Sequence, residues 1–410
     1  MRDGWVATTV GAVTAINSES VRDAESDRIV RYIDLSAVSA GRGIDTTAVA
    51  MMPMKDAPGR ARRVVRGDDV LIATVRPYLR GFAVVPKDLD GEVASTGFAV
   101  LRAQDEKVLP GYLWATVTTD RFVDGLMARA TGSNYPAVRP SDVADQPIDL
   151  PPLVEQRRIV DLIVVADDLA ARAVNMVAAT ERALSSYLDD WFSNVQDDGV
   201  RTVGTLAGLG SGPSWKADDE STTPGDGLVP VVGIPSTPSG SRVVDVSRRV
   251  FVRGLSPAVR TLTRDSLLLI RTNGNRSRIG NVYRVPESAV GHAFSAFQIG
   301  ASVTDPANSG YLFWFLSAPN VQRRITDAAS GTTGLGNVSI HWLSQLEVPW
   351  PDERRRRMLV SVADSLEAVS ASSRAVLTRV GAARTAMLAD LLSGEHEIPG
   401  SYDRFLDGAA

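Results

Sequence analysis

Two long stretches of the chain, at about residues 153–193 and 352–393, carry apolar residues at alternating spacings of three and four. With Ile159 at heptad position a, positions a and d of the first stretch are mostly apolar over about four heptads. Adding 200 to each number gives a second, mostly apolar frame in the same register. Sustained spacing of this kind is typical of a coiled-coil seam. Each stretch is therefore predicted to be a single helix, roughly 60 Å long at about 1.5 Å per residue.

The shared register and similar length of the two stretches favour pairing with each other over two unrelated surface helices that dock on their own domains. An antiparallel pair is the simpler closure, because each helix must connect to a globular domain at its end. The residues expected in the seam, or in docking a partner subunit along it, are Ile159, Leu162, Leu169, Met176, Leu359, Val362, Leu366, Val369 and Val376.

Prolines mark where each helix is expected to begin. Pro151-Pro152 precedes the first stretch, and Pro349 and Pro351 precede the second. Proline is tolerated in the first turn of a helix and pushes the preceding residue out of the α region. We expect these residues to fix the joint between a globular domain and its helix. Glu155, Gln156 and Arg157, which follow directly, are expected to serve the joint and a partner subunit rather than chemistry.

The chain repeats itself with a period of about 200 residues, and four landmarks recur in the same order. These landmarks are RGDDVLIATVRP at 66–77 with TRDSLLLIRTNG at 263–274, GYLWATV at 111–117 with GYLFWFL at 310–316, ATGSNYPAV at 130–138 with ASGTTGLGNV at 329–338, and LPPLVEQRRIV at 150–160 with VPWPDERRRRMLV at 348–360. This period is far longer than a solenoid unit, so the repeat indicates domain duplication. The predicted domains are 1–152 and 196–350, with spacer helices at 153–195 and 351–393 and a tail at 394–410.

Both globular domains are predicted to be of the α/β (α+β) class. Short β-branched runs alternate with turn signals such as Asn-Gly. One shorter helix is expected in each domain, near 112–128 and near 311–328.

Charge is segregated along the chain, although the net charge of the whole is only −4. Between Lys55 and Lys87 eight Lys/Arg face three acids, and between Arg242 and Arg284 ten Arg face two acids. The stretch 153–198 runs the other way, with nine acids and four arginines. Two basic patches of this kind are typical of a phosphate-binding protein. A genome that favours arginine explains the choice of Arg over Lys but not the clustering.

Candidate chemistry is sparse. The chain has no cysteine, which excludes disulfides and thiolate metal sites. His292, His341 and His396 are far apart in sequence, and no metal or triad motif is present. The glycine-rich stretches at 208–212 and 331–336 lack the lysine of a phosphate loop, and DPAN at 305–308 lacks the second proline and the aromatic of the base amino-methyltransferase motif. No window approaches a membrane span, and the N-terminus lacks a secretory pattern, so we expect a cytoplasmic protein without catalytic residues, metal or cofactor.

Arginine-rich polar loops at corresponding places in the repeat are the candidate DNA contacts. Arg and Asn suit guanine and adenine edges, and both also bind phosphates. A solvated hairpin would explain either loop alone, but both lie inside the basic patches. The candidates in the first domain are Arg60, Arg62, Arg63, Arg76, Tyr78, Arg80, Thr131, Ser133, Asn134 and Tyr135, and those in the second are Arg271, Asn273, Asn275, Arg276, Ser277, Arg278, Thr332 and Thr333.

The same motifs resemble the specificity subunit of type I restriction–modification enzymes, over nearly the whole chain. The resemblance rests on LPPLVEQRRIV, GSNYPAV, RGDDVLIATVRP with STGFAVL at 95–101, and MLADLLSG at 387–394. The second copy departs from the pattern, with ERRRR in place of an acid-Gln-Arg run. The resemblance implies two target recognition domains that read a bipartite DNA site, and a helix pair that spaces them and docks two methyltransferase subunits. In such complexes S-adenosylmethionine, ATP and Mg belong to the partner modification and motor/nuclease subunits.

Two other functions fit the residues. A standalone DNA-binding adaptor of another defence or recombination system would lack a methyltransferase and a helicase-nuclease among its neighbouring genes. A coiled-coil adaptor for proteins would show no salt-dependent DNA binding.

Overall fold

The computed structural model describes residues 4–40, 43–195, 199–330, 335–395 and 398–403. The chain divides into two compact units. Unit 1 comprises residues 1–173 and 375–410, and unit 2 comprises Val174–Arg374. Each unit therefore contains one globular domain and one half of each long helix.

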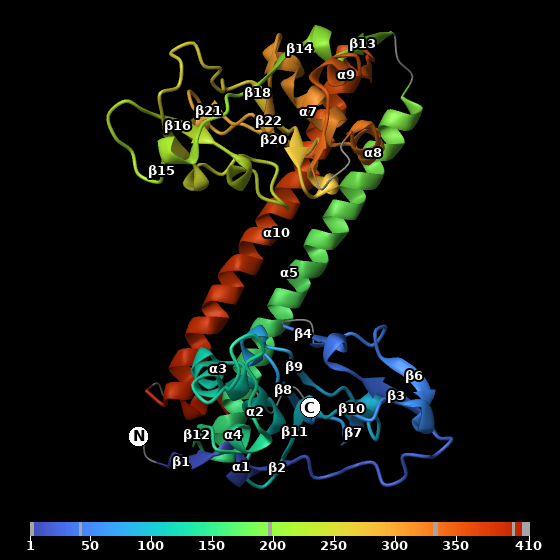
Figure 1. Cartoon of the computed structure of the whole chain (residues 1–410), viewed down its shortest axis with the longest axis vertical. Helices are drawn as coiled ribbons and strands as arrows, with labels where there is room; N and C mark the ends of the chain where they lie inside the picture. The colour runs from blue at the N-terminus through green and yellow to red at the C-terminus, as the bar shows by residue number, and fades with distance from the viewer. Residues whose placement is uncertain (1–3, 41–42, 196–198, 331–334, 396–397, 404–410) are drawn as a thin grey trace. The chain divides into compact units, whose positions relative to one another are not determined.

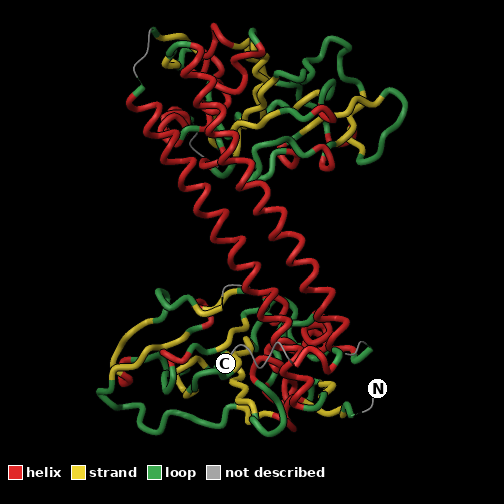
Figure 2. Tube along the Cα trace, turned by 180° about the vertical axis from the view of Figure 1, so that it is seen from behind, coloured by secondary structure: helices red, strands yellow, loops and turns green. Residues whose placement is uncertain are grey.

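The two long helices are α5 (Leu153–Asn194) and α10 (Glu353–Ser393), which confirms the expected helix pair (Figure 1). Their halves run antiparallel within each unit. In unit 1 the Arg384 guanidinium donates to Asp167, and in unit 2 the Ser370 hydroxyl donates to Glu181 over 3.0 Å. Residue numbers thus fall along α10 as they rise along α5. In each unit most of the strands lie to one side of the paired helix segments (Figure 2).

The seam of the helix pair differs from the expected a and d positions. Position a holds, with Ile159 and Leu359 almost fully buried. The second seam position is e, where Ile163, Leu184 and Ala363 are at most 4% exposed. Residues at the expected d positions beyond Leu162 lie outside the seam: Leu169, Met176, Val362, Val369 and Val376 are 38–50% exposed. Both d and e carry apolar residues, so a 3-4 spacing fits either frame, and packing against the domain cores selects e.

The domain of unit 1 is built on two four-stranded sheets, with strand orders β2-β11-β8-β9 and β6-β3-β10-β7, and on the small pairs β1-β12 and β4-β5. Every pairing is antiparallel except that of β10 with β3. The strands are β1 (Val6–Thr9), β2 (Thr14–Ile16), β3 (Ile29–Ile33), β4 (Val38–Ser39), β5 (Gly43–Ile44), β6 (Ala50–Pro53), β7 (Ala61–Val64), β8 (Val70–Ala73), β9 (Phe82–Val84), β10 (Val93–Ser95), β11 (Phe98–Ala103) and β12 (Pro147–Leu150). The short helices are α1 (Val10–Val13), α2 (Pro110–Val117), α3 (Asp120–Met127) and α4 (Pro140–Ala144).

In the domain of unit 2 the sheet β14-β22-β18-β20 and the pair β13-β24 repeat β2-β11-β8-β9 and β1-β12. Its second sheet, β15-β17-β16-β21, has the parallel pair at one edge, and a further pair is β19-β23. Its strands are β13 (Val200–Thr202), β14 (Ala207–Ser211), β15 (Glu220–Ser221), β16 (Leu228–Val232), β17 (Val250–Arg253), β18 (Ser266–Ile270), β19 (Thr272–Asn273), β20 (Val282–Arg284), β21 (Ala293–Phe294), β22 (Gln298–Val303), β23 (Gly336–Asn337) and β24 (Glu347–Pro349). Its helices are α6 (Val203–Leu206), α7 (Ser309–Ser317), α8 (Pro319–Ala328) and α9 (Ile340–Ser344). The α+β class of both domains is confirmed.

Near 112–128 and near 311–328, where a single helix was expected, each domain has two short helices. In unit 1 the Thr119 hydroxyl accepts a hydrogen bond from the Phe122 N–H and caps α3, so the helix started by α2 ends before it. In unit 2 Pro319 stands in the first turn of α8, where it cannot continue α7.

The core of each domain continues onto its own helix segments. In unit 1 Tyr112 and Leu113 cluster with Ile159, Leu388 and Leu391. In unit 2 Tyr311, Trp314 and Phe315 cluster with Leu188, Phe192 and Leu359, among others. Each domain is therefore anchored on residues from both long helices. None of the helices in the described part of the chain has the length and apolar character needed to cross a membrane.

Candidate nucleic-acid interface

In unit 1, residues 75–80 form a loop after β8 with an unusual backbone. Arg76 and Arg80 both have a φ of 51°, the left-handed region that non-glycine residues seldom occupy. The Arg76 N–H donates to the Pro136 carbonyl over 2.7 Å, and the Arg76 guanidinium lies 4.1 Å from the centre of the Tyr135 ring. The loop is thus held against a second, distant segment of the chain.

That second segment, residues 131–137, is a narrow loop. Thr131 and Ala137 exchange backbone hydrogen bonds of 2.9 Å, and Gly132 turns the chain with a φ of +93°. Ser133, Asn134 and Tyr135 are exposed, Tyr135 by 67%. Tyr78, in the neighbouring loop, is 48% exposed. The fold therefore gathers six of the ten candidates of the first domain on one surface: Arg76, Tyr78, Thr131, Ser133, Asn134 and Tyr135.

The other four candidates of the first domain are tied down to different degrees. Arg80 donates to the Thr118 carbonyl over 2.6 Å and pairs with Asp120, so its guanidinium joins the loop to α2 and α3. Arg60 pairs with Asp34 over 2.9 Å, and Arg62 is exposed, with its Nε on the Gly59 carbonyl. The buried Arg63 Nε has no hydrogen-bond partner among the described residues.

In unit 2 the corresponding loop, residues 271–278, is also held by a distant segment. Thr272 and Asn273 pair with Asn337 and Gly336, and the Thr272 hydroxyl donates to the Asn337 Oδ1 over 2.8 Å. Arg276 donates to the Ala329 carbonyl over 2.6 Å. The same two loops thus meet in both domains.

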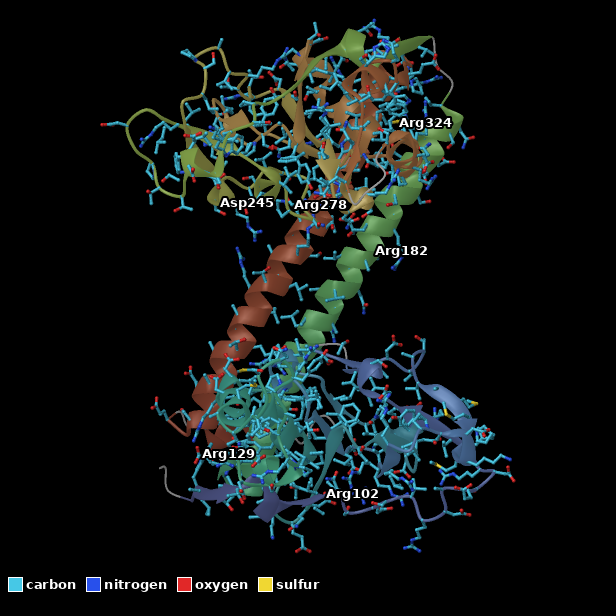
Figure 3. All side chains as sticks on the ribbon, viewed as in Figure 1. Arg102, Arg129, Arg182, Asp245, Arg278 and Arg324 are labelled. Carbon is cyan, nitrogen blue, oxygen red and sulfur yellow. The ribbon has the colours of Figure 1, made fainter. Side chains whose placement is uncertain are left out.

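The remaining side chains of this loop are partly engaged. The Asn275 Oδ1 accepts from the Ser277 N–H and hydroxyl, and so shapes the short turn at 276–278. Arg278 donates to the Thr237 carbonyl. The carbonyl of the preceding residue, Ser236, accepts from the Asp245 N–H, and Arg278 and Asp245 are labelled in Figure 3. Thr332 and Thr333 lie outside the described residues.

Strand pairing aligns the two loops position by position. Leu101 pairs with Val70 in unit 1, as Ala301 pairs with Leu267 in unit 2. By this register Thr74 corresponds to Arg271, and Arg76 corresponds to Asn273. The loops are thus equivalent in place but not in residue, and the two domains present different side chains from the same scaffold.

Part of the basic charge is neutralised inside the protein rather than displayed. Arg66 and Arg102 hold Glu19, and hydrogen bonds from Arg66 first and Arg102 second lower the Glu19 pKa to about 2. In unit 2 Arg242 reaches into the helix segments and pairs with Glu181 and Glu367. Its hydrogen bond is the main cause that lowers the Glu181 pKa to about 2. The sequence pattern did not predict these ion pairs, because the paired residues are 47 to 125 positions apart along the chain.

The joint residues have structural roles that the proline pattern did not specify. The fully buried Gln156 accepts from the Leu109 N–H and donates to the carbonyls of Lys107 and Pro151, each over 2.9 Å. The buried Glu155 accepts from the Trp5 indole over 3.2 Å. Arg157 is exposed.

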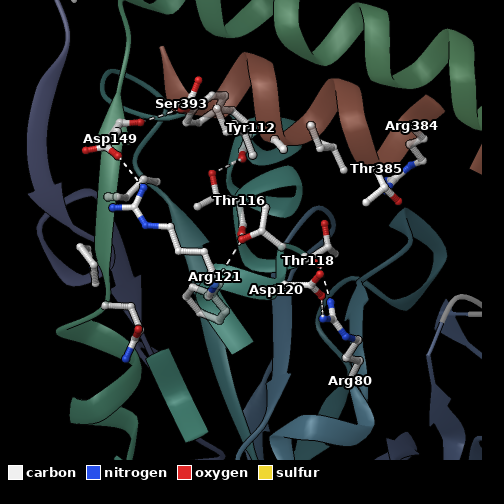
Figure 4. Close-up of a pocket in the computed structure, with 18 residues that line it drawn as sticks. Arg80, Tyr112, Thr116, Thr118, Asp120, Arg121, Asp149, Arg384, Thr385 and Ser393 are labelled. Atoms are coloured by element: carbon white, nitrogen blue, oxygen red, sulfur yellow. Dashed lines mark hydrogen bonds and ion pairs between the residues drawn. The ribbon is translucent and has the colours of Figure 1, made fainter. Parts of the chain in front are cut away.

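A cavity of about 550 Å³ lies in unit 1 between α2, α3, β12 and the last turns of α10 (Figure 4). Tyr112, Thr116 and Arg121 line it from the domain, with Thr385, Leu388 and Leu392 opposite. In unit 2 the corresponding space is filled, because Phe192 packs on Tyr311 and Phe315 with ring centres 5.7 and 5.3 Å apart. Nowhere in the described ranges do three or more His, Asp or Glu gather in a way that could hold a metal.

Comparison with known proteins shows which solved structures share this architecture. No family model matches the chain. The type I restriction enzyme HindI specificity subunit of Haemophilus influenzae is 28% identical over 152 residues, which are 36% of this chain. The match covers about a third (32%) of the length of that relative. A chain from a structure of the assembly and conformational transition of a type I restriction–modification system is similar with a TM-score of 0.60 and 22% identity, over 96% of this chain and 98% of that one. The chain has the fold of a type I specificity subunit.

This fold extends over both repeats and both long helices. The type I restriction–modification S subunit of M. genitalium matches 96% of this chain and 97% of its own length with a TM-score of 0.59, although only 12% of residues are identical. The family resemblance drawn from the sequence motifs is confirmed. In the type I specificity-subunit fold seen here, the duplicated domains carry the paired loops.

Proposed function

We propose that this chain is the DNA-specificity subunit of a type I restriction–modification complex. The observation that carries the proposal is that two copies of one domain bring the same two distant loops together, with different side chains in each. A scaffold that stays constant while its loop residues change suits the reading of two unlike sequences. Each domain would read one part of a bipartite site.

The loop chemistry supports contact with DNA. Arg76 in unit 1 and Arg276 in unit 2 place guanidinium groups beside exposed polar side chains. Such groups contact phosphates and guanine edges, while Asn134, Asn273 and Asn275 suit adenine edges. We assign the base-reading role to these loops and not to Arg80, whose charge is already paired with Asp120.

The long helices would set the spacing between the two half-sites and dock two modification subunits. The exposed apolar residues Leu169, Met176, Val362, Val369 and Val376 lie outside the seam, where a partner helix can cover them. Two similar docking faces on a duplicated chain suit two identical partners.

In this proposal the chain catalyses no reaction. S-adenosylmethionine, ATP and Mg would be bound by the modification subunits and, in the full complex, by motor/nuclease subunits. The chain would act in the cytoplasm, where its DNA is.

Mapping methylated adenines across the genome, with and without this chain, tests the proposal. Loss of one bipartite methylation pattern on deletion, and its return on complementation, is the expected result. An unchanged pattern, together with duplex binding that does not weaken as salt rises, would leave a protein–protein adaptor as the function.

A further inference from the structure

A large aromatic side chain stands out into solvent beside the reading loop of unit 2. Phe297 is 52% exposed, although it lies on a tightly fixed turn between β21 and β22. The buried Gln298 accepts from the Ser295 N–H and hydroxyl over 3.1 and 2.9 Å and donates to the Gly233 carbonyl over 3.1 Å. A rigid turn thus holds an apolar group in water, an arrangement that costs free energy unless something covers the group.

The turn is part of the candidate DNA surface. The Phe297 carbonyl accepts from both the Arg271 and Thr272 N–H groups, over 2.8 and 3.1 Å. The phenyl ring therefore stands at the root of the loop that carries Arg276 and Arg278.

An open cavity of about 530 Å³ adjoins the ring. Its walls are mainly apolar, with Trp215, Ile234 and Pro235 among them. Trp215 is fixed by its indole N–H, which donates to Glu220 over 2.9 Å, and Arg248 lies at the wall. An apolar recess edged by arginine suits a ligand that is apolar at one point and anionic around it.

Among the described residues of unit 1, the position equivalent to Phe297 carries no aromatic side chain. Its pairing register places Gly97 where unit 2 has Phe297, since Phe98 and Gln298 hold the same place opposite β8 and β18. Leu35 occupies the space there, because a Cβ on Gly97 would lie 2.7 Å from the Leu35 Cδ1. The exposed phenyl ring is therefore found at this position in one domain and not at its counterpart in the other, as expected of a group that distinguishes one half-site from the other.

Within the proposed DNA-reading function, we infer that Phe297 and the adjoining recess receive the C5-methyl group of a thymine in the half-site read by unit 2. In the major groove of duplex DNA the thymine methyl is the apolar group that each A·T pair displays, and phenylalanine is one of the side chains that contacts it. Phosphates on either side would meet Arg248 and the arginines of the loop.

The experiment uses the chain reconstituted with its modification subunits and a duplex that carries the mapped methylation site. Each thymine in the two half-sites is replaced singly by deoxyuridine, which lacks only the methyl group. At one position of the unit 2 half-site, binding should weaken about four-fold, the factor expected for burying one methyl group. The Phe297→Ala complex should bind the thymine and deoxyuridine duplexes equally at that position. Val243→Ala, a change at another exposed apolar residue that does not line the recess, should leave the four-fold difference intact.

Three results would overturn the inference: a unit 2 half-site without thymine, no position sensitive to deoxyuridine, or a sensitivity that persists in Phe297→Ala. Weaker binding of Phe297→Ala without any deoxyuridine effect would likewise reject methyl recognition, in favour of stacking. These failures differ from failure of the proposed function, in which the wild-type complex would not prefer the mapped duplex over unrelated DNA.

Discussion

At the scale of single residues, backbone strain and charge pairing separate arginines that the sequence presents as alike. Of the four described non-glycine residues with positive φ, Arg76 and Arg80 lie in one six-residue loop. Such strain persists only where surrounding contacts impose it, and it gathers at functional sites. The contacts differ, however: Arg80 is bound by Thr118 and Asp120, whereas Arg76 rests on the Tyr135 ring.

Replacing these two arginines should therefore affect different properties, DNA binding for Arg76 and stability for Arg80. Arg76→Ala should weaken duplex binding by the reconstituted complex and reduce the slope of log affinity against log salt by about 1, the loss of one phosphate contact. Arg80→Ala should leave that slope unchanged and lower the thermal stability of unit 1. Fluorescence anisotropy across a salt series and thermal melts measure both. Equal slopes and equal affinities for Arg76→Ala and the wild type would remove Arg76 from the interface.

The cluster around Glu181 gives unit 2 an acid-sensitive contact. Arg242, Arg374 and Ser370 all donate to Glu181, whose pKa is lowered to about 2. A carboxyl whose pKa is depressed on folding stabilises fully above its unfolded pKa, near 4.5, and loses this contribution as the pH falls toward 2. Glu181→Gln should cost about 1 to 2 kcal/mol at pH 7, after allowance for solvent screening.

The difference in stability between wild type and Glu181→Gln should shrink between about pH 5 and pH 3. Urea unfolding at several pH values checks this. Glu287→Gln, which alters an exposed ion pair with Arg264, is the matched control and should change stability little at any pH. A pH-independent penalty for Glu181→Gln would show that the carboxylate charge is not what stabilises the cluster.

At the scale of elements, the sequence predicts what repeats over many residues and misses what depends on partners. The two long helices followed from their length and periodicity. The seam frame did not, because Leu162 and Ile163, and likewise Leu169 and Ala170, satisfy the same spacing on adjacent faces. The loops at 75–80 and 131–137 were predicted as sites, but their contact is made by the carbonyl of Pro136 and the ring of Tyr135, which no pattern in sequence connects to Arg76.

The spacer role predicts the effect of lengthening both helices together. Insertion of seven residues in α5 and seven at the matching place in α10 preserves the a and e seam, and adds about 10 Å to each helix. The gap in the methylated site should grow by about three base pairs, at about 3.4 Å per pair. Methylation mapping of the doubly extended variant reads this directly. An unaltered site in a folded variant would contradict the spacer role, and insertion in α5 alone, which breaks the seam, should reduce folding instead.

Because unit 1 has a cavity where unit 2 is filled by Phe192, exchanging the residue types at positions 192 and 392 should change the stability of the two units unequally. Phe192→Leu should destabilise unit 2 by roughly 1 to 2 kcal/mol, because the rings of Tyr311 and Phe315 lose a packed partner. Leu392→Phe, at the equivalent place in α10, should be tolerated because it points into the cavity of unit 1. Thermal melts of the two variants make the comparison. Equal losses would show that the cavity collapses too tightly to receive a ring.

At the scale of the whole molecule, the units are assembled from segments that interleave along the chain. Unit 2 is continuous from Val174 to Arg374, whereas unit 1 combines residues 1–173 with 375–410. The second segment is integral to unit 1: Leu388, Leu391 and Ile398 join its core, and Asp403 pairs with Arg158 over 2.5 Å.

This interleaving has a consequence for synthesis on the ribosome. The first domain leaves the ribosome before the second, yet the core residues it takes from α10 are translated only after the whole of unit 2. Unit 2 has all its residues once Arg374 has emerged, while unit 1 still awaits Leu388 and Leu391. Of the two units, the one whose synthesis begins first is thus completed second, and until then it exposes an apolar face that the second half of α10 later covers.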